Sequence, residues 1–337
     1  MDALLEPSPI GLACTAGGFH IDPWGPAERA VLTHAHGDHA RPGSALYYCA
    51  APGAGILRHR FGDAAAIEAV PYREPFRLGD ATVSFHPSGH VLGGAQVRIE
   101  VGGTVWVVSG DYKRTPDPTC EPFEVVPCDT FVTEATFALP IFHWPETSTV
   151  IREIHDWWTA GRDAGRPSVL FAYALGKAPR ILAELRALTS EPVYTHGAIE
   201  AMVEAYRAAG VPLLETRPVP EKKRGTSLAG ALVLAPLSAS GSIWMRRFPG
   251  AETAFASGLM RIRGTRRRKN FDRGFVLSDH ADWPQLLRTI ADTGARRVLA
   301  THGYTHALAR YLAERGVAAD VLPTPYAGEA DLEVGST

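Results

Sequence analysis

The stretch VLTHAHGDHA, residues 31–40, constrains this chain more than any other part of it. It sets four potential metal ligands within six positions, at His34, His36, Asp38 and His39. Histidines two residues apart in an extended loop can point their rings to the same side, so His34 and His36 could bind one metal ion. Asp38 and His39 could bind a second, because zinc accepts imidazole and carboxylate donors and paired ions lie roughly 3.5–4 Å apart. The cluster predicts a metal site that needs further ligands.

Candidates for those further ligands stand at the ends of later apolar runs. They are His90 in PSGHVLGG, Asp111 in VVSGDYKR, His280 in LSDHAD and His302 in ATHGYTH. Small residues beside each one leave the approach to the side chain open, while the preceding strand fixes its backbone. We therefore expect the fold to bring several of them to the 34–39 loop.

The pattern along the 337 residues changes twice. The first part consists of short β-type runs and a hairpin, AQVRIEV-GG-TVWVVSGD, in which Gly102 and Gly103 supply the positive φ angles of a two-residue turn. After TFVTEATF, helices expected at roughly 147–163, 177–188 and 197–209 alternate with strands, which predicts a parallel sheet. The run GFVLSD then leads to helices near 283–293 and 304–315, and the histidine-bearing loops return. This predicts an α/β protein whose first domain is interrupted by an insertion.

Composition narrows the setting. The 45% apolar content suffices for a sizeable core, and the four cysteines form no C-x-x-C pair, so we expect reduced thiols. No apolar run approaches the roughly 18–20 residues that span a bilayer, and the start MDALLEPSPIG lacks the features of a signal peptide. We expect a cytoplasmic protein without a membrane partner. A net charge of −2 means that a polyanion would have to meet a local basic patch.

Taken together, these motifs resemble a known family. H-x-H-x-D-H, then G-H in a glycine-rich turn and S-G-D after a strand, is similar to the metallo-β-lactamase fold. SGHVLGGA, SGDYKR, TEATF, FAYALGKA, SDHADW and the final THG resemble the β-CASP nucleases, and RGFVLSDHADW most resembles the bacterial ligase-associated DNA exonucleases. The resemblance covers nearly the whole chain. It implies an αββα sandwich formed by residues 1–136 and 273–337, with a β-CASP-like α/β domain inserted at 137–272.

The resemblance also implies roles for individual residues. It assigns one divalent metal to His34, His36, His90 and Asp111, and a second to Asp38, His39, Asp111 and His302, with Asp111 bridging and Asp38 also in the catalytic set. His280 would face the scissile phosphate and Glu134 would orient it, while Asp22 in GFHIDPW would support the metal loop. Zinc is the first expectation for both metals, with manganese as the alternative. His196 and His306 are alternatives to His302 that rank below it, because one falls in the insertion and the other one turn into a helix.

A basic run suggests the partner. RIRGTRRRKNFDRG holds seven basic residues from Arg261 to Arg273 against one acid, Asp272. Such a run is often only a solvated loop, but its place just before LSDHAD predicts that it grips phosphates. The candidate contacts to the nucleic-acid backbone are Arg261, Arg263, Arg266, Arg267, Arg268, Lys269 and Lys177. For Lys177 a lysine on a helix surface is an equal alternative. Nothing resembles a base-reading module, so binding should be independent of sequence.

We therefore expect a two-metal phosphodiesterase that acts on DNA ends, a DNA exonuclease in repair. A β-CASP ribonuclease is the alternative, because the ligand set serves both nucleic acids, and the residues leave polarity and exonuclease against endonuclease action open. A small-molecule hydrolase on this fold and a non-catalytic scaffold rank lower. The basic run disfavours the hydrolase, and the complete set of candidate ligands disfavours the scaffold. Association with a DNA ligase and a helicase follows from the family resemblance alone.

Overall fold

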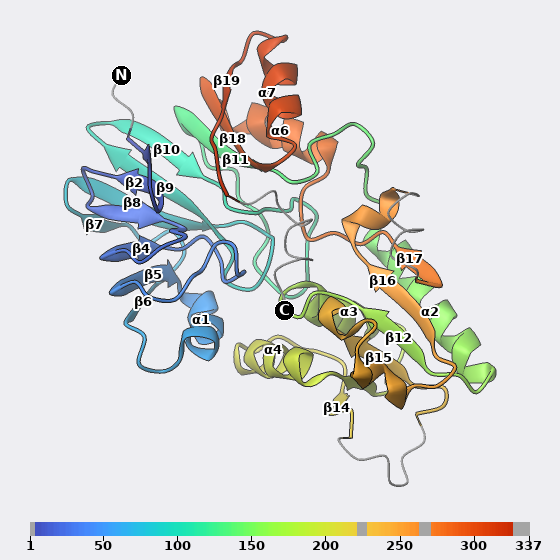
Figure 1. The fold of residues 1–337 in the computed structure, drawn as a ribbon. Coiled ribbons are helices and arrows are strands. Elements are labelled where there is room, and N and C mark those ends of the chain that lie inside the picture. The colour runs from blue at the N-terminus through green and yellow to red at the C-terminus, as the bar shows by residue number, and fades with distance from the viewer. Residues whose placement is uncertain (1–3, 221–227, 263–270, 326–337) are drawn as a thin grey trace. The chain divides into compact units, whose positions relative to one another are not determined.

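The computed structural model describes residues 4–220, 228–262 and 271–325, and it divides into two compact units (Figure 1). The first takes the described residues of Met1–Phe142 and His280–Gly335, and the second those of His143–Asp279. Strands and helices are mixed in both units, which confirms the predicted α/β class.

The second unit begins and ends several residues later than the insertion predicted at 137–272. At its start, Phe137 and Phe142 are fully buried in the first unit, where their rings lie 4.8 Å apart. At its end, the strand Arg273–Phe275 pairs with Glu252–Ala256 of the second unit. The sequence motifs showed where strands end. The boundaries of the second unit lie a few residues further on, because they depend on which unit each following segment packs against.

The first sheet of the first unit has six strands in chain order. They run at Glu6–Ser8 (β1), Gly11–Cys14 (β2), Phe19–Ile21 (β3), Arg29–Val31 (β4), Leu46–Ala50 (β5) and Ile67–Val70 (β6). β1 to β3 pair antiparallel, and β3 to β6 pair parallel. A short 3-10 helix, Ala51–Gly53, and α1, Ala54–Phe61, connect β5 to β6.

The second sheet of this unit has seven strands in the order β19-β18-β11-β10-β9-β8-β7. They run at Phe76–Leu78 (β7), Ala81–Pro87 (β8), Ala95–Val101 (β9), Thr104–Val108 (β10), Thr130–Ala135 (β11), Arg297–Gly303 (β18) and Ala318–Val321 (β19). β9 and β10 form the predicted hairpin, with φ angles of 57° at Gly102 and 79° at Gly103. β18 pairs with β11 in this sheet, although the whole second unit separates the two strands in the chain.

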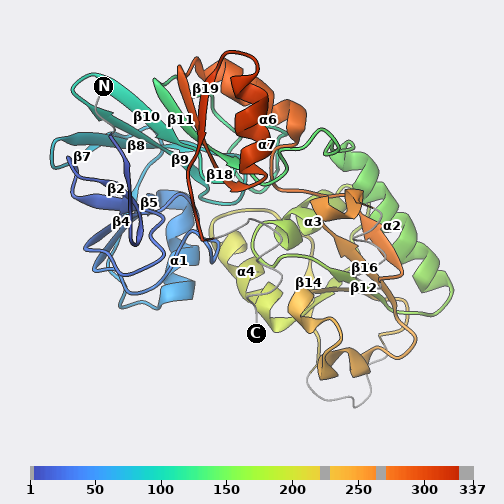
Figure 2. The same cartoon turned by 45° about the horizontal axis from the view of Figure 1, so that its top comes forward.

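Two apolar layers hold the first unit together. The two sheets pack through a shared core that includes Phe19 and Val31 from one sheet and Phe85 and Trp106 from the other. On the far face of the second sheet, α6 (Trp283–Thr293) and α7 (Thr305–Ala313) lie against β11 and β18 (Figures 1 and 2). The carboxyl ends of β4, β10, β11 and β18 carry the loops that hold the candidate site.

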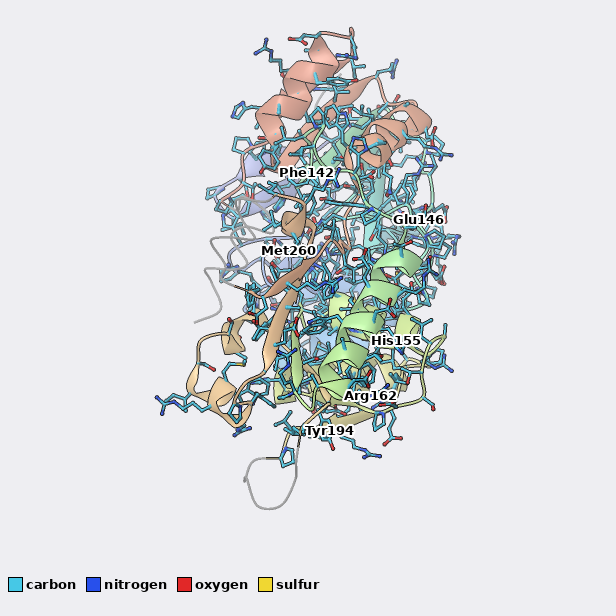
Figure 3. All side chains as sticks on the ribbon, turned by 90° about the vertical axis from the view of Figure 1, so that its right-hand side faces the viewer. Phe142, Glu146, His155, Arg162, Tyr194 and Met260 are labelled. Carbon is cyan, nitrogen blue, oxygen red and sulfur yellow. The ribbon has the colours of Figure 1, made fainter. Side chains whose placement is uncertain are left out.

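The second unit is built on one parallel sheet of six strands in the order β14-β13-β15-β12-β16-β17. The strands run at Ser168–Phe171 (β12), Val193–Thr195 (β13), Thr216–Pro218 (β14), Leu232–Ala235 (β15), Glu252–Ala256 (β16) and Arg273–Phe275 (β17). The main helices are α2 (Thr147–Asp163), α3 (Lys177–Leu185) and α4 (Gly197–Ala208), with 3-10 turns at Leu237–Ala239, Ile243–Arg247 and Gly258–Arg261. Figure 3 shows α2 with Glu146 just before its first residue and Arg162 in its last turn.

Alternating side chains divide the faces of this sheet. Leu170 of β12 joins a core with the buried faces of α2, α3 and α4. Its neighbours Val169 and Phe171 join a second core with Phe248 and Met260. Buried positions on both faces of a parallel sheet agree with the predicted alternation of helix and strand. In the part of the chain that the structure describes, no helix is long and apolar enough to cross a membrane.

Candidate metal centre

The HAHGDH loop follows β4 and turns tightly. The backbone N–H groups of His39 and Ala40 both donate to the carbonyl of His36, at 3.2 and 2.8 Å. From α1, the guanidinium of Arg60 donates to the carbonyls of Ala35 and His36. Hydrogen bonds within the turn and from Arg60 thus both hold this backbone, and the side chains project from a well-fixed turn.

The structure brings four of the predicted ligands into one group: His34, His36, His90 and Asp111. The Nδ1 atom of His36 lies 3.0 Å from His34 Nε2 and 3.1 Å from His90 Nε2. The Oδ2 atom of Asp111 lies 3.3 Å from His34 Nε2 and 3.6 Å from His90 Nε2. His36 is half-buried, and the other three side chains are buried.

These separations can be compared with a zinc coordination sphere. Zinc binds imidazole nitrogen and carboxylate oxygen at about 2.0–2.2 Å, so two donors at the corners of a tetrahedron around it lie about 3.3–3.6 Å apart. The measured separations of 3.0–3.6 Å lie close to that range. The first group therefore fits a tetrahedral metal ion.

A second group brings together Asp38, His39 and His302. The Nε2 atom of His39 lies 3.7 Å from Asp38 Oδ2, and its ring stacks on that of His302 with centroids 4.8 Å apart. Both His39 Nε2 and Asp38 Oδ1 are buried without a hydrogen-bond partner among the described residues. Buried polar atoms are almost always paired, so these two fit metal ligands.

Asp111 lies between the two groups. Its Oδ2 faces His34 and His90, and its Oδ1 lies 3.5 Å from His39 Nε2. Gly110 makes this placement possible, because its φ is +55° and a Cβ there would come within 2.6 Å of Thr33 Cβ. The S-G-D motif thus packs its glycine against the metal loop and directs one carboxylate at both groups.

His302 reaches the site through an unusual backbone. Its φ is +53°, and that of Gly303 is +80°. A Cβ on Gly303 would lie 2.5 Å from the carbonyl oxygen of Ala135. The pairing of β11 with β18 also shifts register between Glu134 and Ala135. Left-handed conformations in non-glycine residues are uncommon and concentrate at functional sites, which favours a specific role for His302.

Asp22 holds the metal loop from behind. Its carboxylate accepts from the backbone N–H of Thr33 at 2.8 Å and from the Thr33 hydroxyl at 2.6 Å. The Nδ1 of His39 donates to the same carboxylate at 2.8 Å, so Nε2 is turned toward Asp38 and Asp111. These bonds are compatible with the predicted support of the metal loop by Asp22, because carboxylates commonly orient metal-binding histidines.

The histidines of the two groups differ in their pKa values. Burial and nearby imidazoles lower the pKa of His34 and His90 well below the ordinary histidine value, and burial lowers that of His302. Burial also acts to lower the pKa of His39, but Asp111 and Asp38 outweigh it and hold that pKa well above its ordinary value. Histidine binds a metal as the neutral imidazole, so the lowered pKa values of His34 and His90 favour metal binding, whereas the raised pKa of His39 opposes it.

His280 and Glu134 form a pair beside these groups. His280 Nδ1 donates to Glu134 Oε2 at 2.9 Å, and Glu134 Oε1 accepts from the backbone N–H of Tyr112 at 2.8 Å. Burial raises the pKa of Glu134, while His280 lowers it and Asp111 raises it. The hydrogen bond is compatible with the prediction that Glu134 orients His280. Asp111, Glu134 and His280 also bring donor atoms within 4.8 Å, so a metal ligand is the alternative role for His280.

The alternatives to His302 lie elsewhere. His306 is exposed on α7, and His196 precedes α4, where its Nδ1 accepts from the backbone N–H of Ala198 at 3.1 Å. Among the described residues, neither belongs to a group of closely spaced donors. The geometry thus agrees with the choice of His302.

The expectation that Lys177 is a surface lysine is wrong. The side chain is 1% exposed, and its Nζ lies 3.8 Å from Asp279 Oδ2 and 4.5 Å from the ring centroid of Tyr173. It begins α3 on a face that turns into the protein, and its contact with a phosphate stays a prediction. Arg261 is exposed at the end of a 3-10 helix. The other predicted contacts, Arg263, Arg266, Arg267, Arg268 and Lys269, lie outside the described residues.

Sequence reasoning missed two residues that hold the metal loop. Thr33 bonds to Asp22 and could have been noticed as a hydroxyl directly before His34. Arg60 lies 24 residues beyond His36 and carries no motif. Only the packing of α1 against the loop reveals its contact.

No protein-family model matches the chain. Among curated proteins, it is 33% identical over 314 residues to a probable DNA ligase of Opitutus terrae, a match that takes in 92% of the chain but 30% of the relative. It is 32% identical over 122 residues to Endoribonuclease YSH1 of Yarrowia lipolytica, with 34% of the chain and 14% of the relative covered. An RNase J-like protein of Methanocaldococcus jannaschii is 25% identical over 142 residues, covering 40% of the chain and 34% of the relative. The chain therefore spans between 14% and 34% of the length of each of these relatives.

The fold is also found among solved structures. A protein of unknown function from Enterococcus faecalis superposes with a TM-score of 0.59 over 88% of this chain and 79% of its own, at 13% identity. At that identity the likeness concerns the fold alone. The curated matches agree with the resemblance to metallo-β-lactamase nucleases and do not single out a subfamily.

Proposed function

We propose that the chain is a two-metal phosphodiesterase that hydrolyses DNA at its ends, a DNA exonuclease acting in repair in the cytoplasm. On this proposal the first unit is a metallo-β-lactamase αββα sandwich, and the second is a β-CASP-like insertion. The observation that carries the proposal is the position of Asp111, whose two carboxylate oxygens face two different donor groups. Two-metal sites of this kind recur in phosphatases and nucleases.

The proposed ligands follow the two groups. His34, His36, His90 and Asp111 would hold one divalent metal, and Asp38, His39, Asp111 and His302 the other, with zinc first and manganese as the alternative. When bound, such metals polarise phosphoryl oxygens and lower the pKa of water, which supplies a nucleophile at neutral pH. His280 would donate to the phosphoryl oxygens or to the leaving oxygen. Glu134 would orient its ring and stabilise its positive charge, and Asp38 would act in both the metal-binding and the catalytic set.

Three separate observations bear on the substrate. The match to a probable DNA ligase covers most of the chain and favours DNA, together with association with a ligase and, by the family resemblance, a helicase. The shorter matches to an endoribonuclease and an RNase J-like protein favour RNA, so a ribonuclease is the second candidate. On either substrate, Arg261 and the basic run after it would meet backbone phosphates, and affinity should then fall steeply with salt.

The test is parallel digestion of end-labelled DNA and RNA, single and double stranded, with zinc, manganese or a chelator. The proposal expects metal-dependent release of mononucleotides or short products from DNA, and loss of activity with the chelator. Cleavage of RNA alone would move the assignment to a ribonuclease. No cleavage of either, with metal bound, would overturn the proposal.

The role of His280 has its own test. Replacing His280 by Ala should lower turnover about 10²- to 10⁴-fold, the usual contribution of a general acid, while metal content stays at the wild-type level. Metal content is measured by plasma mass spectrometry on the same preparations. Loss of metal in His280→Ala would make His280 a ligand, as the Asp111, Glu134 and His280 group allows.

A further inference from the structure

A row of four aromatic rings, each in contact with the next, runs from the candidate site to the surface of the first unit. The ring of His280 lies 5.7 Å from that of Phe137, Phe137 lies 4.8 Å from Phe142, and Phe142 lies 5.9 Å from Tyr304. Phe137 and Phe142 are fully buried, and Tyr304 at the outer end is 37% exposed. Phe142 is labelled in Figure 3.

The backbone fixes where Tyr304 presents its ring. Its N–H donates to the carbonyl of Ala135 at 2.7 Å, and it directly follows the two positive-φ residues His302 and Gly303. The same chain conformation that directs His302 to the second donor group therefore also positions the ring. An aromatic ring that is held at its backbone and backed by Phe142 loses little conformational entropy when it binds a ligand.

Exposed apolar side chains are few in the part of the chain that the structure describes. The large ones are Ile141, Leu188, Ile243 and Tyr304. Two of these four belong to this region: Tyr304 is the outer ring of the row, and Ile141, which is 52% exposed, directly precedes Phe142 in the sequence. The remaining pair, Leu188 and Ile243, belong to the second unit.

We propose that Tyr304 is a stacking platform for a nucleobase of the substrate, next to the phosphate that the metal centre would cleave. This inference rests on the proposed function. A nucleobase suits the ring because every base has a π face, so stacking holds the strand without reading its sequence. Phosphate contacts alone fix the backbone, whereas a base on Tyr304 would also fix the register of the strand at the metal groups.

The experiment measures equilibrium binding in chelator, so that cleavage plays no part. Two fluorescein-labelled single-stranded 20-mers are compared by polarisation: one of thymidylate, and one of base-free tetrahydrofuran spacers. Tyr304→Leu and Tyr304→Ala should weaken thymidylate binding about 10-fold, the order expected for the loss of one stacked base. Binding of the base-free 20-mer should change less than about 2-fold, and Tyr304→Phe should bind thymidylate as the wild type does.

Matched controls separate stacking from damage to the fold. Leu188→Ala removes an apolar side chain of similar exposure, 38%, from the second unit, and should leave both affinities unchanged. Thermal unfolding of each variant checks that the chain is folded. Since Tyr304→Leu and Tyr304→Phe both keep an apolar side chain, a folded pair with different affinities isolates the ring.

Unchanged thymidylate binding in Tyr304→Leu, or an equal loss for both 20-mers, would overturn the inference. The proposed function is checked separately by hydrolysis of bis-p-nitrophenyl phosphate by the wild-type protein with zinc or manganese. Absence of hydrolysis would count against the proposed metal chemistry, whereas the stacking inference would still be decided by the binding measurements.

Discussion

The two donor groups of the first unit are close together and built from similar residues, yet they differ in kind. In the first, three imidazoles and one carboxylate oxygen converge at 3.0–3.6 Å, and the pKa values of His34 and His90 are lowered. In the second, the distances from His39 Nε2 are 3.5 and 3.7 Å, and the pKa of His39 is raised. The first group is more tightly spaced and its buried histidines resist protonation, whereas the second is looser and its His39 favours a proton.

This difference follows from what surrounds each group. In the first group, burial has the largest effect on the pKa values of His34 and His90, and it disfavours their protonation. The second lies among Asp22, Asp38 and Asp111, whose charges favour a proton on His39. A metal ion entering the second group must displace that proton, so we expect the first group to bind the more strongly.

The largest test is Asp111→Asn, which alters both groups at once. An amide lacks the charge and the second anionic oxygen, so we expect nuclease activity to fall about 10³-fold or more. Metal content should fall at both groups, as measured by plasma mass spectrometry, while circular dichroism verifies folding. Retention of full metal content would mean that Asp111 does not bridge.

A matched pair should separate the groups. His34→Ala removes a donor from the first and His302→Ala one from the second, and each should lower activity about 10²- to 10³-fold. Each should lose one metal ion per chain, and titration with a chelator should show that His34→Ala loses the tighter one. Full metal content in His302→Ala would exclude His302 as a ligand and return attention to His306 and His196.

Asp22→Asn tests whether the support that Asp22 gives the metal loop acts mainly on the second group, through its bond to His39. An amide at this position would weaken the bonds to Thr33 and His39 without removing a ligand, so we expect about a 10- to 100-fold loss of metal affinity. Only the weaker metal should be affected in the chelator titration. An equal loss of both metals would show that Asp22 braces the whole loop.

The smallest effect is expected for Arg60→Gln. The glutamine is too short to bond the carbonyls of Ala35 and His36 as the arginine does, which loosens the loop near the first group. We expect less than about a 10-fold loss of affinity, confined to the tighter metal. Arg58→Gln, on the same helix, is the control and should bind both metals normally.

Strand and helix positions were largely predictable, because apolar periodicity decided them. The helix expected at roughly 147–163 is Thr147–Asp163, and that expected near 283–293 is Trp283–Thr293. The boundaries between the units were not predictable to the residue. They depend on tertiary contacts: Phe137 packs on Phe142 in the first unit, and Arg273 pairs with a strand of the second.

The donor residues were also predictable, since each stands in a short motif at a strand end. The spacing within residues 34–39 already divided that loop into two pairs, whereas the assignment of His90, Asp111 and His302 to these pairs came from the family resemblance. Lys177 shows the limit of a motif: its position before a helix suggested a surface residue, and burial against Asp279 was invisible in the sequence. The contact of Arg60 was hidden in the same way, because packing, not local pattern, created it.

The order of the donors along the chain has a consequence for synthesis. The first group is complete once Asp111 has been made, whereas the second waits for His302, which lies beyond the whole second unit. At about 5–20 residues per second, that interval is roughly 10–40 s on the ribosome. On the proposed assignment, a growing chain could take up one metal early and still be unable to cut nucleic acid until nearly all of it has emerged.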